Sequence, residues 1–129
     1  MSEDRRARGR AAYASQFRLS EDDAERYLVD RYGAAFAEEA LNAAAGAWGA
    51  PDDPLTPRER SLIVVAALAA QGGVEERLRG HVRWAVDHGA TRAELEALAG
   101  VLAVYAGYPR ASVALEVVRE ELDRLEAER

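Results

Sequence analysis

The sequence contains no cysteine, and this absence removes several kinds of chemistry at once. A thiol nucleophile, a disulfide and a metal site with cysteine ligands are all excluded. Long hydrophobic runs are also missing, because the longest, Leu62 to Ala70, has nine residues, whereas a membrane-spanning helix needs about 20. Nothing resembles a targeting signal. We therefore expect no membrane contact and a cytoplasmic location.

Several catalytic motifs are absent as well. The sequence has no glycine-rich phosphate loop, no nucleophile elbow and no dinucleotide fingerprint, so nucleotide-dependent chemistry is disfavoured. Its two histidines, His81 and His88, are two helical turns apart and form no HExxH pattern. A metal site needs more ligands at suitable spacing. We therefore predict that the protein uses no metal.

Charge is distributed unevenly along the 129 residues. Residues 1–10 carry four arginines against Glu3 and Asp4, a net charge of +2, which leaves −8 on the rest of the −6 chain. An acidic body repels phosphate backbones, so we expect no nucleic-acid partner. The basic residues 1–15 are interpreted as a flexible arm.

The periodicity of the remaining chain predicts an all-α fold of about six helices in one domain, residues 16–129. No run of alternating β-branched residues has strand length. Helices are expected over about 20–32, 35–47, 56–71, 75–88, 91–106 and from 110 onward, with a loop over 49–55.

Two helix starts are defined by local chemistry. Thr56-Pro57-Arg58-Glu59 combines an N-cap, a proline at N1 and a capping-box glutamate, and Thr91 with Glu94 forms a second capping box. The helix after Thr56 is apolar on every side from 62 to 70, which predicts burial all round, in a bundle or partly against another subunit. The last helix has a two-heptad apolar seam at Ala111, Leu115, Val118, Leu122 and Leu125.

His81 is the most informative titratable residue. It shares a helical face with Leu78 and Ala85, so its imidazole should point toward the core or a cleft. A structural histidine bonded to a main-chain carbonyl is the alternative. His88, near the end of the same helix, is interpreted as a capping residue.

Other candidates lie near helix ends. Arg60 is close enough to the buried helix for its guanidinium to face a cavity, where it would suit a carboxylate, and Arg58 is equally well explained as a surface residue. Tyr105, Tyr108 and Arg110 gather at a helix junction and could line the mouth of a pocket. Tyr105 also fits the Leu98–Leu102 stripe and could therefore belong to the core.

Taken together, LTPRERSLIVVAALAAQGG and LRGHVRWAVDHGATRAELEALAGVLAVYAGYPRASVAL resemble the carboxymuconolactone decarboxylase family over about 55–122. The resemblance implies an AhpD-like helical bundle and a ring-like homo-oligomer, trimeric or hexameric. Thiol members of this superfamily carry Cys-x-x-Cys before the histidine and a glutamate where this chain has Ser61. This chain resembles the cysteine-free members, so it is not a thiol peroxidase.

The resemblance implies a carboxy-lyase of aromatic catabolism that needs no cofactor and acts on a small carboxylated lactone or related unsaturated acid. His81 would be the general acid/base and Tyr105 or Ser61 a hydrogen-bond donor. The substrate carboxylate would bind to Arg60, and the substrate-binding set would also include three further residues: Trp84, Tyr108 and Arg110.

Two segments depart from the family pattern. Asp87-His88-Gly89 stands where the decarboxylases commonly have Asn-Asn-Gly, and residues 50–54 replace their Arg-Pro-Gly loop. A changed pocket on a retained scaffold leaves two alternatives open. One is a tailoring enzyme of secondary metabolism. The other is a non-catalytic oligomeric helical protein that binds a small molecule.

Overall fold

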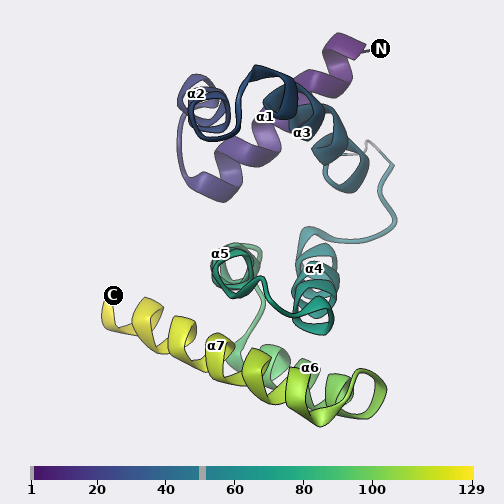
Figure 1. Ribbon diagram of the computed structural model, residues 1–129, viewed down its shortest axis with the longest axis vertical. Helices are drawn as coiled ribbons and strands as arrows, with labels where there is room; N and C mark the ends of the chain where they lie inside the picture. The colour runs from purple at the N-terminus through teal and green to yellow at the C-terminus, as the bar shows by residue number, and fades with distance from the viewer. Residues whose placement is uncertain (1, 50–51) are drawn as a thin grey trace. The chain divides into compact units, whose positions relative to one another are not determined.

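The computed structural model describes residues 2–49 and 52–129 and is all-helical, which confirms the predicted fold class (Figure 1). These residues form seven helices and no strand, so the expected count of about six is corrected to seven. The helices are α1 (Ser2–Phe17), α2 (Glu21–Tyr32), α3 (Ala34–Ala47), α4 (Pro57–Gln71), α5 (Glu75–Asp87), α6 (Arg92–Tyr105) and α7 (Tyr108–Ala127).

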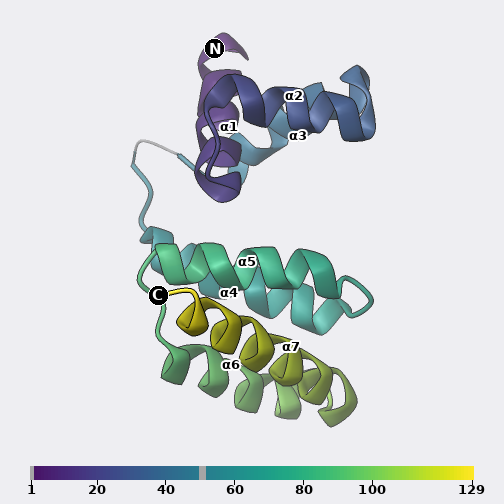
Figure 2. The same cartoon turned by 90° about the vertical axis from the view of Figure 1, so that its left-hand side faces the viewer.

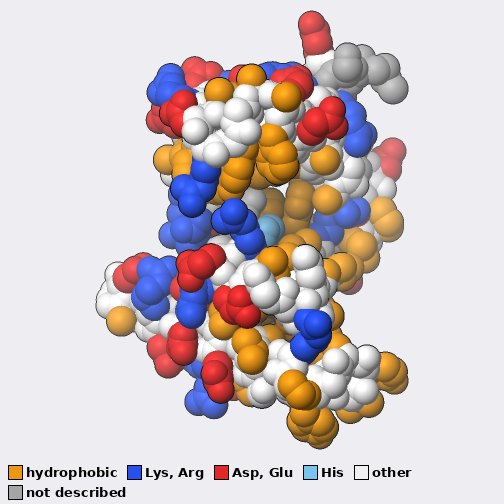
Figure 3. Space-filling view, viewed as in Figure 1, with side chains coloured by type: hydrophobic (Ala, Val, Ile, Leu, Met, Phe, Trp, Pro, Cys, Tyr) orange, Lys and Arg blue, Asp and Glu red, His pale blue; other side chains and the backbone are white. Residues whose placement is uncertain are grey.

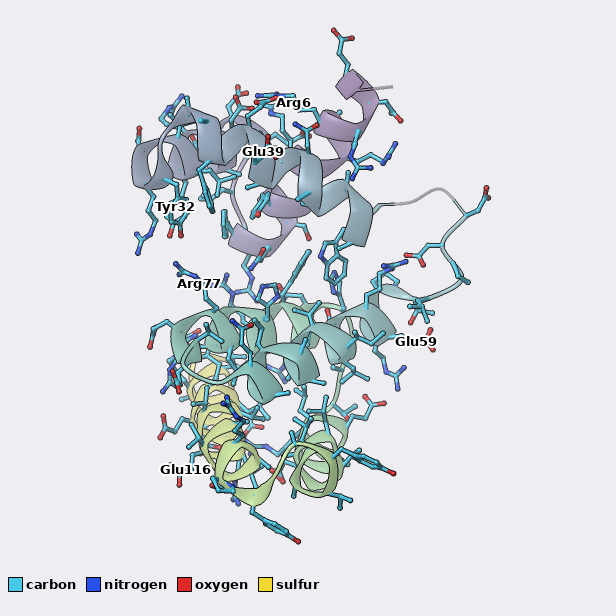
Figure 4. All side chains as sticks on the ribbon, turned by 45° about the vertical axis from the view of Figure 1, so that its right-hand side comes forward. Arg6, Tyr32, Glu39, Glu59, Arg77 and Glu116 are labelled. Carbon is cyan, nitrogen blue, oxygen red and sulfur yellow. The ribbon has the colours of Figure 1, made fainter. Side chains whose placement is uncertain are left out.

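The additional helix is α1, in the segment that was expected to be an arm. Its arginines pair with acidic residues of the two following helices: Arg6 with Glu25 and Glu38, and Arg10 with Glu25. These pairs draw the basic segment onto an acidic surface. Arg6 lies in this group in Figure 4.

The chain divides into two compact units, Met1–Pro54 and Leu55–Arg129. In the first unit, α1, α2 and α3 pack against one another around Leu28, Ala37 and Leu41. Gly9 of α1 lies so close to α3 that an added Cβ would come within 3.0 Å of the Leu41 carbonyl oxygen. The predicted loop 49–55 joins the units, and its residues 50 and 51 lie outside the described residues.

The second unit is a four-helix arrangement in two layers, with α4 beside α5 and α6 beside α7 (Figure 2). Helix α7 contacts both α4 and α5, and α6 contacts α4. The apolar residues between the layers form the larger core: Val65, Ala69, Leu78, Val82, Ala85, Ala90, Leu95, Ala114, Val117, Val118 and Leu122.

The predicted caps are confirmed. The Ser20 hydroxyl accepts from the Asp23 amide at the start of α2. Complete capping boxes open α4 at Thr56 and α6 at Thr91, and Figure 4 shows Glu59 at the start of α4. These ends form as predicted because each depends on residues within three positions of the other.

Burial around α4 is one-sided within the second unit. Ser61, Val65 and Ala69 face the interior at a spacing of four, while Ile63 is 54% exposed. The prediction of burial within a single bundle is therefore wrong, and burial against another subunit stays a prediction. None of the described helices is long and apolar enough to cross a bilayer.

The predicted seam of α7 is used inside the unit. Val118 and Leu122 belong to the core between the layers. The buried face is wider than a heptad seam, since it also includes Ala114, Val117 and Glu121.

Candidate functional site

A polar contact in the second unit joins α4 to the end of α5. The hydroxyl of Ser61 lies 2.7 Å from Nδ1 of His88. Ser61 is only 2% exposed, because it occupies the first interior position of α4. The α4–α5 packing brings Ser61, in the second turn of α4, next to the C-cap of α5, so a buried hydroxyl orients the His88 ring.

Trp84 lies between the two histidines of α5. Its ring centroid is 4.8 Å from that of His88 and 6.0 Å from that of His81, and both pairs are tilted. The three rings share a face because they are separated by three and four residues. Trp84 is itself buried, with 3% exposure. The helix thus presents two imidazoles on either side of one indole.

Burial governs the charge of both imidazoles. Loss of solvent lowers the pKa of His81 below its usual 6.5. The pKa of His88 is also lowered by burial, which outweighs the opposing effect of the neighbouring Asp87 carboxylate. Both rings are therefore mainly neutral at pH 7, and each can accept a proton or, once protonated, act as a stronger acid than free histidine.

The prediction for His88 as a capping residue is confirmed for its main chain. His88 is the C-cap of α5, and its amide donates to the carbonyls of Trp84 and Ala85. The bond to Ser61 was not predicted. A histidine two turns after His81, facing the start of an antiparallel partner helix, was the signal that could have found it.

The arginines at the start of α4 differ in role. Arg58 pairs with Glu94 of α6 and thereby links the two capping boxes. The hydrogen bonds from Arg58 and from the Thr91 amide lower the pKa of Glu94 to about 2. Arg58 is thus a structural residue, and Arg60, half-buried, stays the predicted carboxylate ligand.

Tyr105 and Tyr108 are 86% and 74% exposed. The interpretation of Tyr105 as core is wrong, because the inward face of α6 passes through Leu95, Ala99 and Leu102, and the helix ends as Tyr105 falls to the side of it. A phenol so exposed contacts little of its own chain. The second unit does not by itself bring these tyrosines into the group formed by the histidines.

Arg110 lies apart from the two histidines, at the α4–α5 turn. Its guanidinium donates to the main-chain carbonyl of Gln71, and it lines a pocket of about 410 Å³ at the α4–α5 turn whose lining includes neither histidine. The structure therefore brings together Ser61, His81 and Trp84 of the predicted site, with His88 added, and separates Arg110 from them. Within residues 2–49 and 52–129, no group of three or more His, Cys, Asp or Glu side chains is arranged to hold a metal ion.

Comparison with known proteins identifies the family to which most of the chain, including the second unit, is similar. Residues 34–120 match the model of the carboxymuconolactone decarboxylase family. A 4-carboxymuconolactone decarboxylase from Acinetobacter baylyi (strain ATCC 33305 / BD413 / ADP1) is 38% identical over 76 residues, which cover 57% of this chain and 56% of that protein. The chain thus spans about half the length of this curated relative. No solved structure matches the chain significantly. Because the family model covers most of the sequence, this chain belongs to the carboxymuconolactone decarboxylase family.

Proposed function

We propose that this protein is a cofactor-free decarboxylase that acts on a small carboxylated lactone or a related unsaturated acid. Family membership and the similarity to a 4-carboxymuconolactone decarboxylase support the reaction class. The observation that carries the proposal is the group formed by Ser61, His81, Trp84 and His88, which we call the histidine face. It offers two imidazoles held against one indole, one of them oriented by a buried hydroxyl.

The reaction needs little from the protein. The bond between a ring carbon and its carboxylate breaks, carbon dioxide leaves, and the electron pair is delocalised through an alkene onto the lactone carbonyl as a dienolate. A proton must then be added to carbon. Hydrogen-bond donors near the carbonyl oxygen stabilise the dienolate, and an acid with a pKa near the working pH supplies the proton.

The histidine face supports specific roles. We assign His81 as the general acid, which protonates the dienolate and regains its proton from solvent. A bound carboxylate would favour the protonated ring, and burial makes that ring a stronger acid. We assign Ser61 as a positioning residue that acts through His88. Arg60 stays the proposed ligand of the substrate carboxylate.

Assembly into a homo-oligomer, trimeric or hexameric, is part of the proposal. Apolar side chains gather at the exposed end of α6 and the start of α7 (Figure 3), where Val104, Tyr105 and Tyr108 are each more than 70% exposed. A second copy would cover them and could bring Tyr105 to a site as a donor. Light scattering should then show an oligomer for the wild-type protein, and Val104→Glu should weaken its assembly. A monomeric wild-type protein would contradict the proposed homo-oligomer. The AhpD-like arrangement and the cytoplasmic location also stay proposals.

The direct test compares the wild-type protein with His81→Gln on candidate carboxylated lactones, followed by ultraviolet absorbance. Glutamine keeps a polar side chain of similar reach but cannot protonate carbon. We expect wild-type turnover and at least about a 100-fold loss in the variant, with an unchanged circular dichroism spectrum. Full activity in His81→Gln would refute the role of His81. Saturable binding by the wild type without turnover would favour the non-catalytic binding protein instead, and turnover of larger rings alone would favour the tailoring enzyme.

A further inference from the structure

The pocket of about 410 Å³ in the second unit is separate from the histidine face. It is formed where the α4–α5 turn meets the first turns of α7. Most of its lining is apolar and includes Leu68, Leu78, Val113 and Ala114. Its volume lies within the usual range of small-molecule pockets, roughly 300–1,000 Å³.

Arg110 is the basic group of this pocket, and the fold holds it in place. Its guanidinium donates to the Gln71 carbonyl at the end of α4. The next residue, Gly72, has a φ of 73°, and a Cβ there would come within 3.0 Å of the guanidinium. Glycine at this position therefore serves the left-handed turn, and it leaves room for the Arg110 guanidinium.

Arg110 also differs from four other arginines of its unit. Arg58, Arg79, Arg92 and Arg124 each pair with a carboxylate. No carboxylate of the described residues pairs with Arg110. A guanidinium has five N–H donors in a planar fork, and one main-chain carbonyl does not use all of them. The remaining donors are available at the rim of an apolar hollow.

We propose that this pocket binds a small monocarboxylate with an apolar body. The carboxylate would accept hydrogen bonds from Arg110, and the body would lie against Leu68, Leu78 and Val113. A fork-shaped cation matches the two oxygens of a carboxylate better than a neutral donor does. Glu75 also lines the pocket, and its negative charge disfavours a second carboxylate on the ligand.

The test is a ¹H–¹⁵N NMR titration of the full chain with 3-phenylpropionate and with its neutral counterpart 3-phenylpropanamide. We expect saturable shifts around Gly72 and Val113 with the acid, at millimolar concentrations or below, and binding of the amide at least about tenfold weaker. Equal affinity for the two compounds, or no saturable binding of the acid, would overturn the proposal.

Variants distinguish Arg110 from a general charge effect. Arg110→Gln should weaken binding of 3-phenylpropionate about tenfold, and Arg119→Gln, which removes an exposed charge from the same helix, should leave it unchanged. Glu75→Gln should improve binding of the dicarboxylate phenylsuccinate more than that of 3-phenylpropionate. Equal effects of the two arginine variants would sink the assignment of Arg110.

This binding is independent of catalysis. His81→Gln should bind 3-phenylpropionate as the wild type does, because His81 does not line the pocket. The pocket can thus be confirmed if the decarboxylase proposal fails, and refuted if it succeeds.

Discussion

The two units of this protein are held together in different ways. The first has a small core around Leu28 and Leu41, and ion pairs such as Arg6 with Glu25 bind α1 to its neighbours. The second has a continuous apolar core between two helix layers and carries both histidines. Surface ion pairs contribute little to stability, whereas apolar burial contributes much. The proposed chemistry would therefore take place on the unit with the larger apolar core.

The largest expected effect on stability is in the first unit. Gly9→Ala places a methyl group within 3.0 Å of the Leu41 carbonyl oxygen. Because that neighbour is backbone, α1 must move away from α3, and we expect a loss of about 1–3 kcal/mol in the unfolding free energy of this unit. Denaturant unfolding followed by NMR would measure each unit. An unchanged first unit would show that α1 does not pack as described.

The second prediction concerns the histidine face. Ser61→Ala removes the hydroxyl that contacts His88. We expect kcat to fall about tenfold with little change in KM, because a tenfold loss is about 1.4 kcal/mol, near the upper end of the net contribution of one hydrogen bond. His88→Gln should have a similar effect, and the double variant should lose little more than either single one. A shift in the acid limb of the pH–rate profile should accompany the loss. Additive losses would contradict the pairing.

A glycine-to-alanine substitution in the second unit should raise its stability, in contrast to Gly9→Ala in the first unit. Gly100 of α6 is exposed, and an added Cβ meets nothing within 4 Å. Gly100→Ala should therefore stabilise the second unit by about 0.5–1 kcal/mol, because alanine loses less backbone entropy in a helix. Destabilisation would mean that α6 is not an exposed helix here.

The smallest expected effect is a difference between the two units in how their stability depends on pH. The folded pKa values of His81 and His88 are lowered, so the unfolded chain binds protons more readily below pH 6.5. The stability of the second unit is thus full above pH 6.5 and falls as the pH drops below it. Glu25 has a pKa lowered from 4.5 by Arg6, so the first unit loses stability only below about pH 4.5. Denaturant unfolding of each unit at pH 7, 5.5 and 4 would show which unit loses stability first as the pH falls. Loss of stability by both units over the same pH range would contradict the prediction.

The sequence was sufficient where structure is local. The caps at Ser20, Thr56 and Thr91 were predicted because each involves residues three positions apart. Helix α1 was missed, since its arginines find their partners on α2 and α3, beyond the reach of a local pattern. The core alternative for Tyr105 is wrong because helical spacing does not tell where the packed face of α6 ends.

The same limit applies to the candidate site, where the roles of the residues stay predictions. Spacing to Leu78 and Ala85 predicts that His81 shares their face, whereas Leu78 and Ala85 belong to the core of the second unit and the His81 ring lies beside Trp84. The contact of Ser61 with His88 depends on how α4 and α5 are aligned, and the separate pocket at Arg110 depends on where α7 begins. Both are products of packing between helices distant in sequence.

The most direct test of the proton-transfer role is the reaction with 4-carboxymuconolactone in D₂O, with deuterium in the product followed by mass spectrometry. The wild-type protein should release carbon dioxide and place one deuteron on carbon in each turnover, while His81→Gln should do so at about one hundredth of that rate or less. Deuterium incorporation by His81→Gln at the wild-type rate would contradict the account.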